Sequence, residues 1–465
     1  MVIQKQANMY SLQITDNHDW KAIARCLPEG VQEVDVDKIK SDLGHIANVI
    51  IGELKIEDNL NLLVFPQNLH QHGDEIGKSQ IIALRGDEIS TGNIMGFVGI
   101  NDTQLDIKSR FANKDGQDLF LHYLLHKVFS VNLFDIKHTT EEQKIFDFLI
   151  FLFPYFLKKA LAQGLFKKYR RFEHNDTNIR GPLNISRHIR ENIPFRGCLA
   201  YFTREHSYDN EVTQLIRHTI EHIRTKQYGA NILNNDLETK DCVSKIVMAT
   251  QTYNVRERNR IINQNLLPMQ HPYYSAYTPL QKICLQILRH EYIKYGQIKD
   301  KIYGILFDGS WLWEEYLKTI LTKCGFEHSE NKKSKGGLRM FEKVSDDEMV
   351  SNNSRKLYPD FYKDDFILDA KYKHLNNGVG REDLYQVVTY MYCTKYNNGA
   401  YVYPLETDEQ IARFRLNGYG GMLQIIPFHI PQTAIDFNTF VEEIKKSETS
   451  LRKYFSTLVL SSGHQ

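Results

Sequence analysis

The sequence lacks the features of secreted, membrane-anchored and zinc-ribbon proteins. Its six cysteines are widely spaced and form no Cys-x-x-Cys pair, which argues against a disulfide framework and favours reduced thiols. The N-terminus has no apolar signal core. The longest apolar run, residues 148–157, contains Pro154 and is far shorter than the about 20 residues of a bilayer span. We therefore expect a cytoplasmic protein without a membrane anchor, in which this run is a buried helix.

Common catalytic and nucleotide-binding motifs are absent as well. The 18 histidines show no His-Glu-x-x-His spacing, and neither a Gly-x-Ser-x-Gly elbow nor a cysteine nucleophile context occurs. Residues 73–79 resemble a phosphate-binding loop, but the glycine spacing is one residue short and a strand-like run follows instead of a helix. We interpret this segment as a turn, so the chain has no nucleotide motor of its own.

The charge balance excludes a strong standalone nucleic-acid binder. The formal net charge is +1, whereas such proteins carry a marked basic excess. The charge is unevenly distributed, because the stretch from Lys158 to Arg196 is rich in lysine and arginine, with aromatic residues between them. Two interpretations of this stretch stay open: a solvated helical face, or a strip that binds DNA or a partner.

Length and hydrophobic patterning predict an α/β protein with several domains. At 465 residues, with 42% hydrophobic and 25% charged residues, the chain is globular and long enough for about two or three domains. We predict a β-rich N-terminal domain over residues 1–115, a helical middle domain over 116–295 and an α/β domain over 296–465. The predicted strands of the first domain include residues 61–65, 80–84, 94–100 and 104–107, and the predicted helices of the second include 141–165, 210–228 and 278–295.

The most informative segment spans residues 358–372, where two apolar runs flank a charged turn. As a hairpin, this segment places Asp369 and Lys371 on one face and brings Asp360 across from Asp369. Two carboxylates then converge beside one ammonium group. Such oxygen ligands suit Mg²⁺, which polarises a phosphate, while the lysine neutralises developing charge. The alternative is a surface hairpin with ordinary salt bridges, because short patterns of this kind recur by chance.

The helix predicted over residues 309–321 adds a possible third acidic group. Its apolar stripe places Glu314 at the border of the buried face and Glu315 nearly opposite, where we expect it to be solvated. Glu314 can thus reach a site at the edge of a packed sheet.

A second helix is predicted over residues 381–391, after the hairpin. Gln386 and Tyr390 lie four residues apart on one of its faces and can act together on Lys371 or on a DNA backbone. Alternatively, both are ordinary residues of the helix surface.

In combination, these motifs resemble the PD-(D/E)XK nuclease domain of the McrC family, the endonuclease subunit of McrBC-type 5-methylcytosine-specific restriction systems. The motifs are Leu312-Trp313-Glu314-x-Tyr316-Leu317, Pro359-Asp360-x8-Asp369-Ala370-Lys371 and Asp383-Leu384-Tyr385-Gln386-x3-Tyr390. Segments at residues 96–110, 164–181 and 208–211 are also similar to the family, so the resemblance extends from about residue 90 onward.

The resemblance implies a restriction-endonuclease-like α/β domain with a central mixed sheet over residues 296–465. It further implies Mg²⁺ as cofactor, with Mn²⁺ as a substitute. The implied catalytic residues are Asp360 and Asp369 as metal ligands, Glu314 as a further ligand or water holder, Lys371 as the residue that orients the attacking water, and Gln386 and Tyr390 as supports of the DNA backbone or of Lys371.

The implied partners are an AAA+ GTPase of McrB type, double-stranded DNA and a second nuclease domain for double-strand cleavage. GTP is used only by the partner, which residues 1–115 are predicted to contact. The resemblance also implies that this contact stimulates GTP hydrolysis by the partner. Near-neutral charge suits a nuclease that another subunit delivers to DNA. Two alternatives stay open: a nuclease subunit of a system that reads an unmodified sequence, and a non-catalytic adaptor that activates the GTPase.

Overall fold

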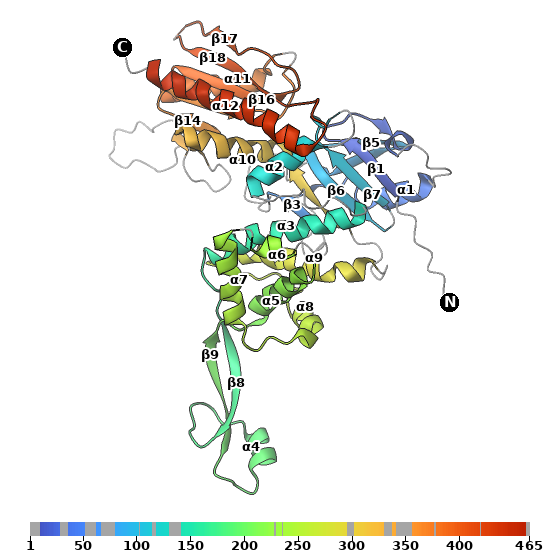
Figure 1. The fold of residues 1–465 in the computed structure, drawn as a ribbon, viewed down its shortest axis with the longest axis vertical. Helices are drawn as coiled ribbons and strands as arrows, with labels where there is room; N and C mark the ends of the chain where they lie inside the picture. Colours follow the sequence, from blue (N-terminus) through green and yellow to red (C-terminus); the bar gives the residue numbers. More distant parts are fainter. Residues whose placement is uncertain are drawn as a thin grey trace, which may run out of the picture. The chain divides into compact units, whose positions relative to one another are not determined.

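In the computed structural model the chain forms two compact units (Figure 1). Unit 1 combines residues 1–134 with 299–465, and unit 2 comprises residues 135–298. The structure describes residues 10–27, 36–51, 62–66, 80–101, 103–113, 118–129, 141–226, 229–234, 236–294, 302–329, 337–340, 356–375, 378–418 and 420–461. The predicted turn at residues 73–79 lies outside these ranges.

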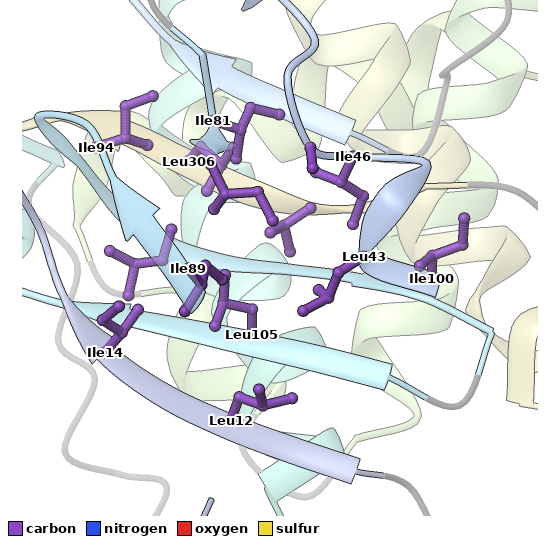
Figure 2. Packing of buried hydrophobic residues seen from close by; sticks show 14 of the residues in the cluster. Leu12, Ile14, Leu43, Ile46, Ile81, Ile89, Ile94, Ile100, Leu105 and Leu306 are labelled. Carbon is purple, nitrogen blue, oxygen red and sulfur yellow. The ribbon is translucent and has the colours of Figure 1, made fainter. Parts of the chain in front are cut away.

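The N-terminal part of unit 1 is built on a five-stranded mixed sheet with the strand order β1-β7-β6-β10-β3. Its strands are β1 (Tyr10–Thr15), β3 (Leu62–Phe65), β6 (Ile94–Ile100), β7 (Thr103–Lys108) and β10 (Tyr303–Asp308). A smaller sheet of β2 (Lys21–Ala22), β4 (Ile82–Arg85) and β5 (Glu88–Thr91) and the helix α1 (Val36–Gly44) accompany it. Isoleucine and leucine side chains from both sheets and from α1 form one buried core (Figure 2). The strands predicted in this region are therefore confirmed, with shifts of one or two residues at their ends.

Strand β10 completes this sheet although it follows unit 2 in the sequence. It pairs antiparallel with β6 and parallel with β3. Gly96 permits the close approach of β6 and β10, because a Cβ atom there would lie 2.1 Å from the Ile305 carbonyl oxygen. The compact units end at residues 134 and 298, whereas the predicted domains end at 115 and 295. The three-domain division stays a prediction.

The C-terminal part of unit 1 is built on a six-stranded mixed sheet with the order β11-β14-β15-β16-β18-β17. The strands are β11 (Glu327–His328), β14 (Phe361–Lys363), β15 (Phe366–Ala370), β16 (Asn398–Leu405), β17 (Ala412–Arg415) and β18 (Met422–His429). A separate pair consists of β12 (Leu338–Arg339) and β13 (Lys356–Leu357). Mixed sheets in both parts confirm the α/β class.

Helices cover both faces of the six-stranded sheet. One face receives α10 (Gly309–Leu321) and α12 (Phe437–Ser461), through the ring contacts of Trp313 with Phe428 and of Phe455 with Phe366. The other face receives α11 (Arg381–Thr394), which lies so close to β16 that a Cβ atom on Gly399 would be 2.5 Å from the sulfur of Met391. Side chains that alternate along a strand therefore point either to α11 or to α10 and α12.

A buried carboxylate joins α12 to α10 and to α2 (Leu119–Phe129). Glu448 accepts hydrogen bonds from the hydroxyls of Tyr123 (2.7 Å) and Tyr316 (3.1 Å), and it pairs with Lys127 (2.9 Å) and Arg452 (3.0 Å). Burial alone would raise the pKa of Glu448, but the hydrogen bonds from Tyr123 and Lys127 outweigh it and lower the pKa. The ionised carboxylate thus holds α10 in place against the sheet.

Unit 2 consists of helices and one long hairpin. The helices are α3 (Glu141–Leu161), α4 (Ile185–Asn192), α5 (Glu211–Arg224), α6 (Gly229–Leu233), α7 (Leu237–Ala249), α8 (Arg258–Gln264) and α9 (Tyr277–Lys294). The hairpin of β8 (Lys168–Asp176) and β9 (Leu199–Ser207) extends away from the other helices and carries α4 near its end (Figure 1). The apolar run at 148–157 lies in α3 and is largely buried, as predicted. Within the described residues, no helix has both the length and the apolar character needed to cross a bilayer.

The buried ring of His218 in α5 makes the stability of unit 2 depend on pH. Its ring is buried against Tyr253, at 4.7 Å between ring centroids, and its Nε2 atom has no hydrogen-bond partner among the described residues. Burial, with a smaller effect of the Arg258 charge, lowers the pKa of His218 to about 4. Stability from the neutral ring is complete above the unfolded-state pKa of about 6.5 and is lost as the pH falls toward 4.

As the pH falls from 7 to 5, His218 becomes protonated in the unfolded state but not in the folded state. We expect this to lower the free energy of unfolding by about 2 kcal/mol. Urea unfolding at both pH values, compared between the wild type and His218→Phe, measures this contribution. The variant keeps the aromatic contact with Tyr253 but cannot be protonated. An equal loss of stability in both proteins would contradict the assignment.

Candidate active site

The segment predicted to carry the chemistry forms the hairpin of β14 and β15. The strands pair antiparallel, from Phe361 opposite Leu368 to Lys363 opposite Phe366. A two-residue turn connects them, and Asp364 adopts the left-handed conformation there, with φ 45°. Aspartate tolerates this conformation better than most residues do. The predicted hairpin is therefore confirmed.

The hairpin brings Asp360, Asp369 and Lys371 together. Asp360 precedes β14, and its Oδ2 atom accepts a hydrogen bond of 2.7 Å from the Ala370 amide at the end of β15. Asp369 is buried, and its Oδ2 atom lies 2.7 Å from the Lys371 ammonium without accepting a hydrogen bond of regular geometry among the described residues. Two carboxylates thus flank one lysine, as the sequence predicts.

Burial and charge determine the ionisation of this cluster. Burial raises the pKa of Asp369, although the nearby Lys371 ammonium opposes the effect. For Lys371, burial lowers the pKa, but the carboxylates of Asp369, Asp360 and Asp383 outweigh burial and raise it. Lys371 therefore stays protonated at neutral pH. It can donate hydrogen bonds and neutralise negative charge, but it has no free electron pair with which to accept a proton.

Two charged residues that the sequence analysis did not assign to the site also belong to this cluster. The Oδ1 atom of Asp383, in the first turn of α11, lies 3.1 Å from the Lys371 ammonium. Its other oxygen contacts the ammonium of Lys373. One signal was available in the sequence, because Asp383 lies three residues before Gln386 and such residues share a helix face.

Gln386 and Tyr390 contact each other as predicted. The Nε2 atom of Gln386 donates to the Tyr390 hydroxyl at 2.9 Å, and this hydroxyl lies 3.5 Å from the carbonyl oxygen of Tyr358. Burial raises the pKa of Tyr390, and the charges of Asp369 and Asp360 add to this effect. Tyr390 is thus a buried neutral hydroxyl near both carboxylates, while Gln386 is exposed.

Glu314 is half-buried on α10, which packs on the sheet face opposite α11. Among the residues that the structure describes, no three His, Cys, Asp or Glu side chains are grouped closely enough to hold a metal ion. The three predicted ligands therefore do not form one group in this conformation. Glu315, predicted to be solvated, is only partly so: its side chain is 28% exposed and lies 3.6 Å from Lys318 and 4.0 Å from His328.

The chemistry of the pair Asp360 and Asp369 fits Mg²⁺. This ion is commonly held by one or two protein carboxylates, with water and substrate phosphates as its other ligands. Asp360 uses one oxygen on the Ala370 amide, and Asp369 has a buried oxygen without a regular hydrogen bond. Both residues thus offer hard oxygen atoms near the C-terminal end of β15.

The end of the β8–β9 hairpin presents an apolar surface in unit 2. We call this the tip surface; its side chains are between 43% and 68% exposed and belong to Ile179, Leu183, Ile185, Ile189, Ile193 and Phe195. Several cations of the surrounding basic stretch are paired with acids of the same unit, as in Arg187 with Glu191 (3.0 Å) and Lys158 with Asp236 (3.0 Å). This stretch therefore exposes an apolar surface beside cations, such as Arg180 and Arg190, that are exposed and paired with nearby carboxylates.

Comparison with known families identifies the chain. A family model described as "McrBC 5-methylcytosine restriction system component" matches residues 89–404. The chain belongs to the McrBC family. The resemblance predicted from the motifs is thereby confirmed, and the matched region includes β14, β15 and α11.

A solved structure shows the same fold despite low sequence identity. One match is to an assembly of Thermococcus gammatolerans McrB AAA+ hexamers with bound McrC, with a TM-score of 0.51, 14% identity, and coverage of 96% of this chain and 100% of the other. A second is to the McrBC complex of the same organism, with a TM-score of 0.34, 12% identity, and coverage of 69% and 89%. No curated protein matches the chain.

Proposed function

We propose that the chain is the McrC-type subunit of a McrBC restriction system, a Mg²⁺-dependent endonuclease that cuts DNA when an AAA+ GTPase engages it. The cluster of Asp360, Asp369 and Lys371 carries the proposal, because two carboxylates and a protonated lysine are the groups that phosphodiester hydrolysis requires. A mixed sheet with helices on both faces, of which β15 forms a central strand, supports assignment of residues 296–465 to the PD-(D/E)XK class.

Each residue of the cluster has a distinct role in this proposal. Asp360 and Asp369 would hold the metal, which when bound polarises the scissile phosphate and lowers the pKa of a bound water. Lys371, which stays protonated, stabilises the negative charge that develops on the phosphate and orients the attacking water. Gln386, whose amide is exposed beside Tyr390, supports the DNA backbone. Glu314 is proposed to hold water from the neighbouring helix α10.

The tip surface is proposed as a contact for the AAA+ GTPase. Contiguous exposed apolar side chains mark protein interfaces, whereas DNA phosphates are bound by unpaired cations. The solved assembly with the same fold contains McrB AAA+ hexamers, which supports an AAA+ partner for this chain as well. Residues 1–115 remain a second proposed contact. Double-strand cleavage would require two nuclease domains to meet.

The test combines the chain with a McrB-type AAA+ GTPase from the same organism, GTP, Mg²⁺ and plasmid DNA with or without 5-methylcytosine. We expect cutting of the methylated plasmid only when all components are present, and no cutting after chelation of the metal. Equal cutting of both plasmids would show that an unmodified sequence is read. No cutting with either Mg²⁺ or Mn²⁺ would overturn the endonuclease and favour a GTPase-activating adaptor.

A further inference from the structure

Two lysines, Lys371 and Lys373, follow the end of β15. Among the described carboxylates, only Asp383 forms an ion pair with both. Its two oxygens contact different ammonium groups, Lys371 at 3.1 Å and Lys373 through the second oxygen. Lys371 and Lys373 are two residues apart, and the ammonium groups of both reach Asp383 in the first turn of α11. Asp383 thus lies on one side of the Lys371 ammonium, and Asp369 contacts the same ammonium at 2.7 Å.

The backbone holds both members of this ion pair. The Tyr401 hydroxyl donates to the Asp383 carbonyl oxygen at 2.8 Å, which fixes the first turn of α11 to β16. The Lys371 amide donates to the Val402 carbonyl oxygen at 2.9 Å, which ties the lysine to the same strand. Because neighbouring residues of β16 anchor both partners, the separation of Asp383 from Lys371 is determined by the sheet.

This ion pair differs from an ordinary surface salt bridge. Surface pairs contribute about 0 to 1 kcal/mol because water screens them and both side chains lose freedom. Here the Lys371 side chain is only 16% exposed and that of Asp383 18%. Hydrogen bonds and charge from Lys373 and Lys371 outweigh the effect of burial and lower the pKa of Asp383, so it is ionised at neutral pH.

We propose that Asp383 is a positioning residue, which holds the Lys371 ammonium beside Asp369 in the orientation needed for cleavage. Without Asp383, the carboxylates of Asp369 and Asp360 attract the ammonium from one side only, and its donors turn toward the metal ligands. Lys373 neutralises the second oxygen of Asp383, which leaves the first for Lys371. This inference rests on the proposed endonuclease function.

The first test separates the rate of cleavage from the binding of DNA. Single-turnover cleavage by Asp383→Asn, in the complex with the GTPase, GTP and Mg²⁺, is expected to be roughly 10- to 100-fold slower, because a misplaced catalytic group costs about this much. The half-saturating DNA concentration should not change, and Asp383→Glu should recover much of the rate. The matched control is Glu382→Gln, which removes an exposed carboxylate from the same helical turn. Equal rates for Asp383→Asn and the control would overturn the proposal.

The second test does not require cleavage. Acetylation of lysines in the full chain with a soluble acylating reagent, followed by mass spectrometry, reports how firmly each ammonium is held. Asp383→Asn should speed the labelling of Lys371 and Lys373 several-fold and leave Lys318 of α10 unchanged, whereas Glu382→Gln should change none of them. If the wild type cuts no DNA, the proposed endonuclease function is overturned. Faster labelling of Lys371 in Asp383→Asn would still show that Asp383 holds this lysine. Unchanged labelling of Lys371 would overturn the positioning role even in a chain that cuts DNA.

Discussion

Asp360→Asn is expected to lower the rate of DNA cleavage on the order of 10³-fold, equivalent to about 4 kcal/mol, while the fold stays intact. The asparagine side-chain oxygen can still accept the hydrogen bond from the Ala370 amide, so the link between β14 and β15 is kept. The negative charge that would hold the metal is lost. Single-turnover cleavage with the GTPase, GTP and Mg²⁺ measures the effect. Asp369→Ala should be as inactive, but it also removes the nearest carboxylate from the buried Lys371.

The matched control for this prediction is Asp364→Asn in the turn of the same hairpin. Asp364 is exposed, and asparagine tolerates its left-handed backbone conformation. This variant makes the same chemical change a few residues away and should cut at the wild-type rate. Both variants should match the wild type in thermal unfolding and in stimulation of GTP hydrolysis. If Asp360→Asn cuts DNA at the wild-type rate, Asp360 is not part of the active site.

Placing aspartate at both Ile185 and Ile189 should reduce stimulation of the GTPase at least about 100-fold, because residues at the centre of an interface each contribute about 2 kcal/mol or more. The two side chains are 68% and 55% exposed, so more than half of each lies outside the packing of the chain itself. In a complex, however, two carboxylates would be buried against an apolar partner surface, which is strongly unfavourable. Titration of the GTPase with the variant, with GTP hydrolysis as the readout, gives the effect directly.

Leu237→Asp on α7 is the matched control, since Leu237 is 86% exposed and belongs to the same unit outside the tip surface. It introduces the same side chain and should stimulate the GTPase like the wild type. GTP-dependent cleavage should fall together with GTPase stimulation in the double variant. If the double variant stimulates normally, the tip surface is not the contact, and residues 1–115 become the next region to examine.

The sequence predicted the parts of the site that depend on local periodicity. Alternation along residues 366–371 correctly placed Asp369 and Lys371 on one face, and the spacing of four residues correctly joined Gln386 to Tyr390. A polar turn between two apolar runs was enough to predict the hairpin. Such patterns are visible in a sequence because the period of a strand or a helix determines which neighbours meet.

Contacts between distant segments could not be predicted in this way. The ion pair between Lys371 and Asp383 depends on how closely α11 packs on β16, and this distance is determined by Gly399 and Met391 rather than by any local pattern. For Glu314, helical periodicity predicted partial burial but not which face of the sheet α10 would cover. The pairing of β10 with β6 joins segments that lie far apart in the sequence, which no periodicity indicates.

The late position of β10 in the sequence has a consequence for protein synthesis. Strand β7 ends at Lys108 and β10 begins at Tyr303, roughly 200 residues later, which takes a ribosome about 10 to 40 s. Until then β6 and β3 lack the strand that lies between them in the sheet, whereas all of unit 2 has already been synthesised. Unit 2 can therefore fold first. The surface proposed to receive the partner would then exist on the nascent chain before the part proposed to cut DNA.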